Sequence, residues 1–139
     1  MKKLELRNDT LEVLQQLLLG AQLKGTTSRF RTRFVKVIGE HLENLKAEHF
    51  QLIQDYAVLD ENGQPVIEDD EYRIREDEYE EFQQAYVELF SEYFAVDINS
   101  ENRKLLKSVL IALDACEDLS GEVAIIHEHV YDQIEKALN

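Results

Sequence analysis

Apolar residues recur at steps of three and four positions along most of the chain, the spacing that places them on one face of an α-helix. The longest stretch of this kind follows the cap-forming residues Thr27 and Ser28. Its apolar positions are Phe30, Phe34, Ile38, Leu42, Leu45, Leu52, Ile53 and Tyr56. The pattern predicts one long helix over about residues 28–56, roughly 40 Å long. Gly39 lies inside it and marks a candidate bend.

Four shorter segments have the same spacing. They predict helices at about residues 10–19, 77–95, 100–116 and 121–138. Asp9 and Glu12 have the form of a capping box at the start of the first, and Ser120 is a candidate cap of the last. The second of the four is rich in aromatic residues, Tyr79, Phe82, Tyr86, Phe90 and Tyr93, which we consider a candidate interaction surface.

Strand patterns are few. Leu4 and Leu6 alternate with charged residues, which favours a short strand at the start of the chain. The Asn62-Gly63 pair between apolar dipeptides predicts a small β-hairpin near residues 57–67. The alternation of Tyr72 with Ile74 favours a third short strand or an extended arm. The predicted fold is mainly α, a single helical domain over residues 1–139 built as a bundle of about five helices.

Composition is consistent with one folded domain. A chain of 139 residues buries roughly 65–70% of its unfolded surface. No apolar run approaches the 18 to 20 residues of a membrane span, the first residues lack the apolar core of a secretory signal, and the single cysteine allows no internal disulfide. The formal net charge of −14 opposes general affinity for DNA or anionic lipid.

The charge is unevenly distributed. Residues 24–38 contain five cations and no acid, whereas residues 60–81 contain eleven acids and two arginines. The five cations are Lys24, Arg29, Arg31, Arg33 and Lys36. Three interpretations stay open: they pair with the acidic segment 60–81, they bind a protein partner, or they contact nucleic acid, with the chain's negative field opposing the last.

No catalytic or metal-binding motif is complete. The segment from Gly20 to Thr27 lacks the lysine that follows the second glycine of a P-loop. An EF-hand centred on Gly63 would have Val58 where the first carboxylate belongs. The histidines have no ligand spacing, and Cys116 lies on an apolar stripe beside acidic residues, which favours a structural thiol. The sequence therefore predicts no catalytic residue, no metal and no cofactor.

Short motifs at three places give a resemblance. They are Leu23-Lys24-Gly25 with Ser28-Arg29 and Arg31, Asp60-Glu61-x-Gly63, and Leu119-Ser120-Gly121-Glu122. In these the chain resembles the DUF1617-like family of small uncharacterised proteins from phages and prophages of low-GC Gram-positive bacteria. The resemblance implies a phage or prophage origin, and so the bacterial host cytoplasm or the virion as the location. It implies no catalytic residues.

Two functional hypotheses follow. The first is a non-enzymatic interaction, assembly or minor structural protein that uses helix surfaces to bind itself or another phage protein, with a homo-oligomer as one form. The second is a nucleic-acid-linked regulator, which would use Arg29, Arg33 and Lys36 to contact phosphates or its acidic face to mimic DNA.

Overall fold

The computed structural model describes residues 2–139 and divides them into two compact units. Unit 1 combines the chain up to Leu42 with Tyr93–Asn139, and unit 2 is Glu43–Glu92. Helix α2, Gly25–Tyr56, contributes residues to both. We describe each unit separately below.

Unit 1 contains a two-stranded antiparallel sheet of β1, Lys3–Arg7, and β4, Tyr93–Asp97. The register pairs Leu4 with Val96 and Leu6 with Phe94. Because side chains alternate between the faces of a strand, Leu4 and Leu6 are buried while the residues next to them are exposed or half-buried. The alternation at the start of the chain therefore produces the predicted strand, and its partner lies about ninety positions away.

Helices α1 (Leu11–Gly20), α4 (Ser100–Asp114) and α5 (Gly121–Leu138) pack with the sheet and with the first part of α2 around one apolar core. A 3₁₀ helix, η1 (Asn8–Thr10), precedes α1. The fully buried large side chains are Leu4, Leu6, Leu11, Leu14, Leu18, Phe34, Ile38, Leu106, Val109, Leu113, Val130 and Ile134. All of them lie at the helical or alternating positions that the sequence pattern marks, so burial follows from that pattern.

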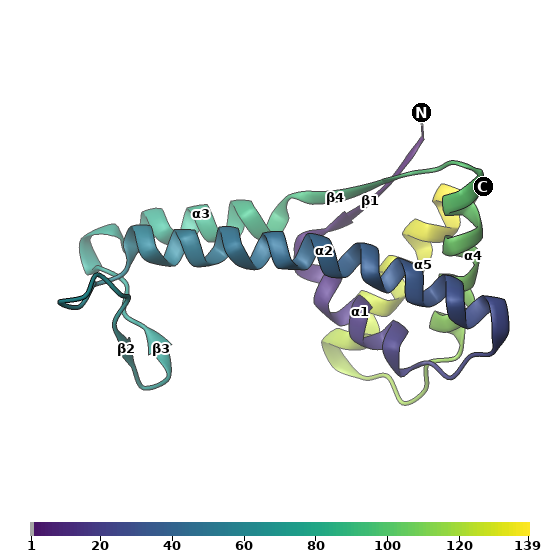
Figure 1. Ribbon diagram of the computed structural model, residues 1–139, viewed down its shortest axis with the longest axis horizontal. Helices are drawn as coiled ribbons and strands as arrows, with labels where there is room; N and C mark the ends of the chain where they lie inside the picture. Colours follow the sequence, from purple (N-terminus) through teal and green to yellow (C-terminus); the bar gives the residue numbers. More distant parts are fainter. Residues whose placement is uncertain (1) are drawn as a thin grey trace. The chain divides into compact units, whose positions relative to one another are not determined.

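Unit 2 contains the end of α2 and helix α3 (Tyr79–Ser91), which runs back beside it (Figure 1). Between the two helices lie strands β2 (Ile67–Glu68) and β3 (Glu71–Tyr72), which pair antiparallel, and the 3₁₀ helix η2 (Glu76–Glu78). Backbone hydrogen bonds from Val58 to Arg73 (2.8 Å) and from Val66 to Val58 (2.8 Å) join this loop into a small three-segment β structure.

The predicted fold class is confirmed: residues 2–139 are mainly helical and contain five α-helices, of which α2 is the long one. The long helix begins at Gly25, three residues before the predicted start. The Asn62-Gly63 turn forms, with Leu59 bridging to Pro65, and the named strand pair follows it at residues 67–72.

One helix boundary was wrong. The spacing of Tyr86, Phe90 and Tyr93 predicted a helix continuing to about Ala95, but α3 ends at Ser91 and Tyr93 begins strand β4. The reason is that residues 93–97 pair with β1 along their whole length, and this long-range pairing overrides the local helical spacing.

Candidate functional site

Arg31, one of the five predicted anion- or partner-binding cations, is buried in unit 1. Its Nη1 atom donates to the carbonyl oxygens of Leu18 (2.6 Å) and Ala21 (2.7 Å) at the end of α1. Its Nη2 atom donates to Ser28 Oγ (3.2 Å). The carbonyl end of a helix carries partial negative charge, which a guanidinium stabilises. Arg31 therefore joins α1 to α2 and has little capacity left for a ligand.

The other four cations of this segment, Lys24, Arg29, Arg33 and Lys36, are exposed. The guanidinium carbons of Arg29 and Arg33 lie 5.7 Å and 5.3 Å from the ring centre of Phe30, within cation–π range. Within the described part of unit 1, residues 2–42 and 93–139, none of the four forms an ion pair. Their charge is directed to solvent.

The predicted aromatic surface is divided by the structure. In unit 2, His49 of α2 contacts the rings of Tyr86 and Phe90 of α3, each at 5.3 Å between centroids, and Tyr56 contacts Phe82 at 5.9 Å. Phe82 and Phe90 are thus half-buried between the two helices, and burial lowers the pKa of His49. These aromatic residues hold the α2–α3 pair together.

Tyr79 and Tyr86 of the same group are exposed, as is Val87 beside them. Because positions separated by seven or eight residues share a helix face, these three form one exposed stripe on α3. Tyr93 is also exposed, but it lies on β4 in unit 1 and is not part of this stripe.

A second exposed apolar group lies on the β2–β3 hairpin. Ile67 and Tyr72 are directly opposite each other in the strand pair, so their side chains lie on one face. The ring of Phe50 on α2 contacts that of Tyr72 at 6.5 Å between centroids. These side chains are 60% (Ile67), 39% (Tyr72) and 40% (Phe50) exposed. We call them the hairpin patch; the sequence pattern predicted a hairpin near residues 57–67, around Asn62-Gly63, and so did not indicate this patch.

Nearly all of the net charge belongs to unit 2. Residues 43–92 contain sixteen Asp and Glu residues and three Lys and Arg residues, a formal net charge of −13 out of −14 for the chain. Two of the three cations form ion pairs: Arg73 pairs with Glu68 at 3.0 Å, and Arg75 pairs with Glu78. Unit 2 therefore has an acidic surface on which apolar side chains are exposed.

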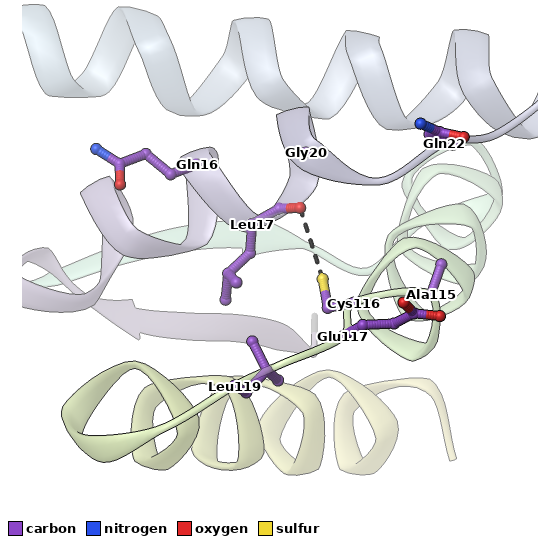
Figure 2. Close-up of a pocket in the computed structure, with 8 residues that line it drawn as sticks. All are labelled: Gln16, Leu17, Gly20, Gln22, Ala115, Cys116, Glu117 and Leu119. Atoms are coloured by element: carbon purple, nitrogen blue, oxygen red, sulfur yellow. Dashed lines mark hydrogen bonds between the residues drawn. The ribbon is translucent and has the colours of Figure 1, made fainter.

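Unit 1 contains an open cavity of about 460 Å³, shown in Figure 2. Leu17 from α1 and Cys116 and Leu119 from the segment between α4 and α5 are among its lining residues. The thiol of Cys116 donates weak hydrogen bonds to the carbonyl oxygens of Ala112 (3.4 Å) and Leu17 (3.6 Å). Burial raises the pKa of Cys116, so the reactive thiolate form is disfavoured. We assign the thiol a structural role.

Two histidines of unit 1, His41 and His127, also make structural contacts. His41 Nε2 lies 2.7 Å from Asn8 Oδ1, and its ring stacks on Phe94 at 4.6 Å. His127 Nε2 lies 2.8 Å from the carbonyl oxygen of Leu113. Across residues 2–139, no group of three or more His, Cys, Asp or Glu side chains is placed to hold a metal ion. No helix in the same range is long and apolar enough to cross a membrane.

Comparisons with known proteins place the chain in no group. No family model matches it, and no curated protein and no solved structure matches it either.

Proposed function

We propose that this protein is a non-enzymatic interaction protein that binds another protein through the exposed apolar side chains of unit 2. The supporting observation is how unit 2 distributes its apolar residues. Among residues 43–92, four apolar residues are buried, whereas seven large apolar side chains are exposed: Phe50, Leu59, Ile67, Tyr72, Tyr79, Tyr86 and Val87.

Two considerations make this distribution a reason to propose binding. A unit of fifty residues has a high ratio of surface to volume and completes a core of its own with difficulty. Exposed apolar groups that cluster, as the hairpin patch and the α3 stripe do, are typical of surfaces that another protein covers. In unit 1, by contrast, the apolar stripes of the helices meet in one core.

The context we propose comes from the resemblance to the DUF1617-like family. In that context the protein is made in a bacterial host by a phage or prophage. It acts there as an assembly factor or as a minor component of the virion. Its partner is a second copy of itself or another phage protein.

Site-specific photo-crosslinking in the cell that makes the protein tests this proposal. A photoreactive amino acid replaces Ile67 of the hairpin patch in one variant and Ile125, an exposed residue of α5 (70%), in the control. We expect a discrete protein adduct from position 67 and none from position 125. Equal adducts from both positions, or none from position 67, would overturn the proposal.

A second candidate is the nucleic-acid-linked regulator, which the exposure of Arg29 and Arg33 without an ion pair within unit 1 favours. If these cations contact phosphates, the double variant Arg29→Gln/Arg33→Gln lowers nucleic-acid affinity and flattens its dependence on salt. A wild-type protein with no salt-sensitive binding to DNA or RNA excludes this direct contact and leaves only acidic mimicry of DNA.

A further inference from the structure

We propose that the hairpin patch docks a cationic polypeptide segment, rich in lysine and arginine and carrying apolar anchor residues, and does not dock a second copy of this chain. This inference rests on the proposed function, because it names the chemistry of the partner that unit 2 binds. It is carried by the apolar patch together with the charge around it.

The patch offers contacts for large apolar side chains. Ile67 and Tyr72 lie side by side on one face of the hairpin, and the Phe50 ring extends that face onto α2. All three side chains keep more than a third of their surface exposed. A partner that covers them removes apolar surface from water, which contributes about 25 cal/mol for each Å².

Carboxylates lie directly beside the patch. The hairpin reads Ile67-Glu68-Asp69-Asp70-Glu71-Tyr72, so four consecutive acids connect the two apolar residues. Adjacent Cα atoms are about 3.8 Å apart, and the Debye length at physiological salt is about 8 Å. The carboxylates nearest in the chain to Ile67 and Tyr72 therefore impose a negative potential on anything that docks there.

The negative charge of these acids does little for the hairpin itself. Glu68 and Glu71 are opposite each other in the register, a like-charge arrangement that destabilises a strand pair. Among residues 43–92 only Arg73 forms an ion pair with any of the four, and that pair is exposed, so it contributes little. The hairpin thus carries negative charge that its own fold does not require, and that a cationic partner would neutralise.

The charge also selects among occupants. A symmetric contact between two copies through this patch would bring two units of formal charge −13 together, which is repulsive. Anionic lipid and nucleic acid are repelled for the same reason. A segment with lysine or arginine around apolar side chains can pack on the apolar face and pair with the carboxylates.

A calorimetric titration of the full chain with two synthetic peptides tests the inference. The first probe contains only leucine and lysine and is about 14 residues long, enough for roughly four helical turns. The second has glutamate in place of every lysine. We expect the lysine peptide to bind with an affinity that falls as salt rises, and the glutamate peptide not to bind. Equal affinity for both peptides, or no binding of the lysine peptide at low salt, would overturn the inference.

Two matched pairs of variants locate the binding. The apolar pair is Phe50→Ser/Ile67→Ser/Tyr72→Ser in the patch and Leu19→Ser/Ile111→Ser/Ile125→Ser among exposed residues of unit 1. The charge pair is Glu68→Gln/Asp69→Asn/Asp70→Asn/Glu71→Gln in the hairpin and Glu5→Gln/Glu117→Gln/Glu128→Gln/Glu135→Gln in unit 1. The two variants of a pair remove the same number of side-chain groups. In the charge pair, both variants therefore change the overall charge by the same amount.

We expect each hairpin variant to lower the affinity for the lysine peptide by about tenfold. Each unit 1 variant should lower that affinity by less than about twofold. Circular dichroism checks that every variant retains its helices. Equal losses from the two charge variants would show unspecific attraction and overturn the inference. A salt-independent dimer that the Phe50, Ile67 and Tyr72 substitutions dissociate would also overturn it, while leaving the proposed function in place.

Discussion

Arg31 donates a hydrogen bond from Nη1 to the backbone carbonyl oxygen of Leu18, at 2.6 Å. The donor is on α2 and the acceptor is in the last turn of α1, so the bond closes the connection between the two helices. The same guanidinium reaches Ala21 and Ser28. Helix ends leave carbonyl groups without helical partners. Arg31 donates to two carbonyl groups at the end of α1 with one buried side chain, and Leu18 also accepts a longer bond from the Ala21 N–H at 3.4 Å.

Removing these donors should destabilise the fold. Arg31→Met keeps much of the side-chain volume but leaves the carbonyl groups of Leu18 and Ala21 without this donor. We expect the free energy of unfolding to fall by about 2–4 kcal/mol, measured by urea denaturation. The control is Arg33→Met, an exposed neighbour, which should change stability by no more than about 0.5 kcal/mol. Equal effects from both would contradict the role assigned to Arg31.

The aromatic contacts of His49 predict a pH dependence. Burial lowers the pKa of His49, so the unfolded chain takes up a proton more readily than the folded one. Stability is therefore retained above the unfolded value, near pH 6.5, and is lost as the pH falls below it and through the folded value. His49→Phe keeps a ring against Tyr86 and Phe90, and it should reduce this loss between about pH 7 and pH 5.

The measurement for His49 is thermal unfolding over that pH range. Other groups titrate there, so the informative quantity is the difference between the wild type and the variant. The control is His129→Phe at an exposed position of α5. If both variants show the same pH profile as the wild type, the lowered pKa of His49 does not contribute to the pH dependence of stability.

Substitutions in the turn of the β2–β3 hairpin should raise the free energy of unfolding. Asp69 and Asp70 both have positive φ, 52° and 65°, as a two-residue type I′ turn requires, and Asn-Gly is the preferred pair for it. We expect Asp69→Asn/Asp70→Gly to raise stability by about 1 kcal/mol. Asp69→Asn/Asp70→Asn removes the same charge and should raise it less. Chemical denaturation compares the two; a larger gain from the second variant would show that charge, and not backbone conformation, dominates.

Gly39 in α2 is a further position to test. A Cβ built there would lie 3.3 Å from Gln15 Nε2, the end of a flexible side chain. Gly39→Ala should therefore raise stability by about 0.5–1 kcal/mol through helix propensity. Gly25→Ala is the opposite case, because Gly25 has a φ of 60° and alanine is strained there. Differential scanning calorimetry should show an increase in Tm for the first and a decrease for the second.

Much of the fold could be predicted from local patterns. The apolar spacing of the helices, such as Leu11, Leu14 and Leu18 in α1, identifies the residues that unit 1 buries. The end of α3 could not be predicted, because Tyr93 continues the helical spacing and only its pairing with Arg7 in the register of β1 makes it part of a strand. Pairing between strands that are distant in the sequence cannot be inferred from the local pattern of apolar residues.

The candidate site was less predictable. Arg31 is of the same residue type as Arg29 and Arg33, and only the position of Leu18 and Ala21 distinguishes it. The hairpin patch had a signal in the sequence, two apolar residues separated by four acids, but the Asn62-Gly63 pair predicted the hairpin near residues 57–67 instead. The prediction of a single domain stays a prediction, as does the phage origin.

The central claim is that the recognition surface lies in residues 43–92. Hydrogen–deuterium exchange of the full chain, with and without the lysine–leucine peptide, tests it most directly. We predict slower exchange in the end of α2 and in residues 65–75 when the peptide is present, with residues 100–138 unchanged. Protection confined to residues 100–138, or spread equally over the chain, would contradict the claim.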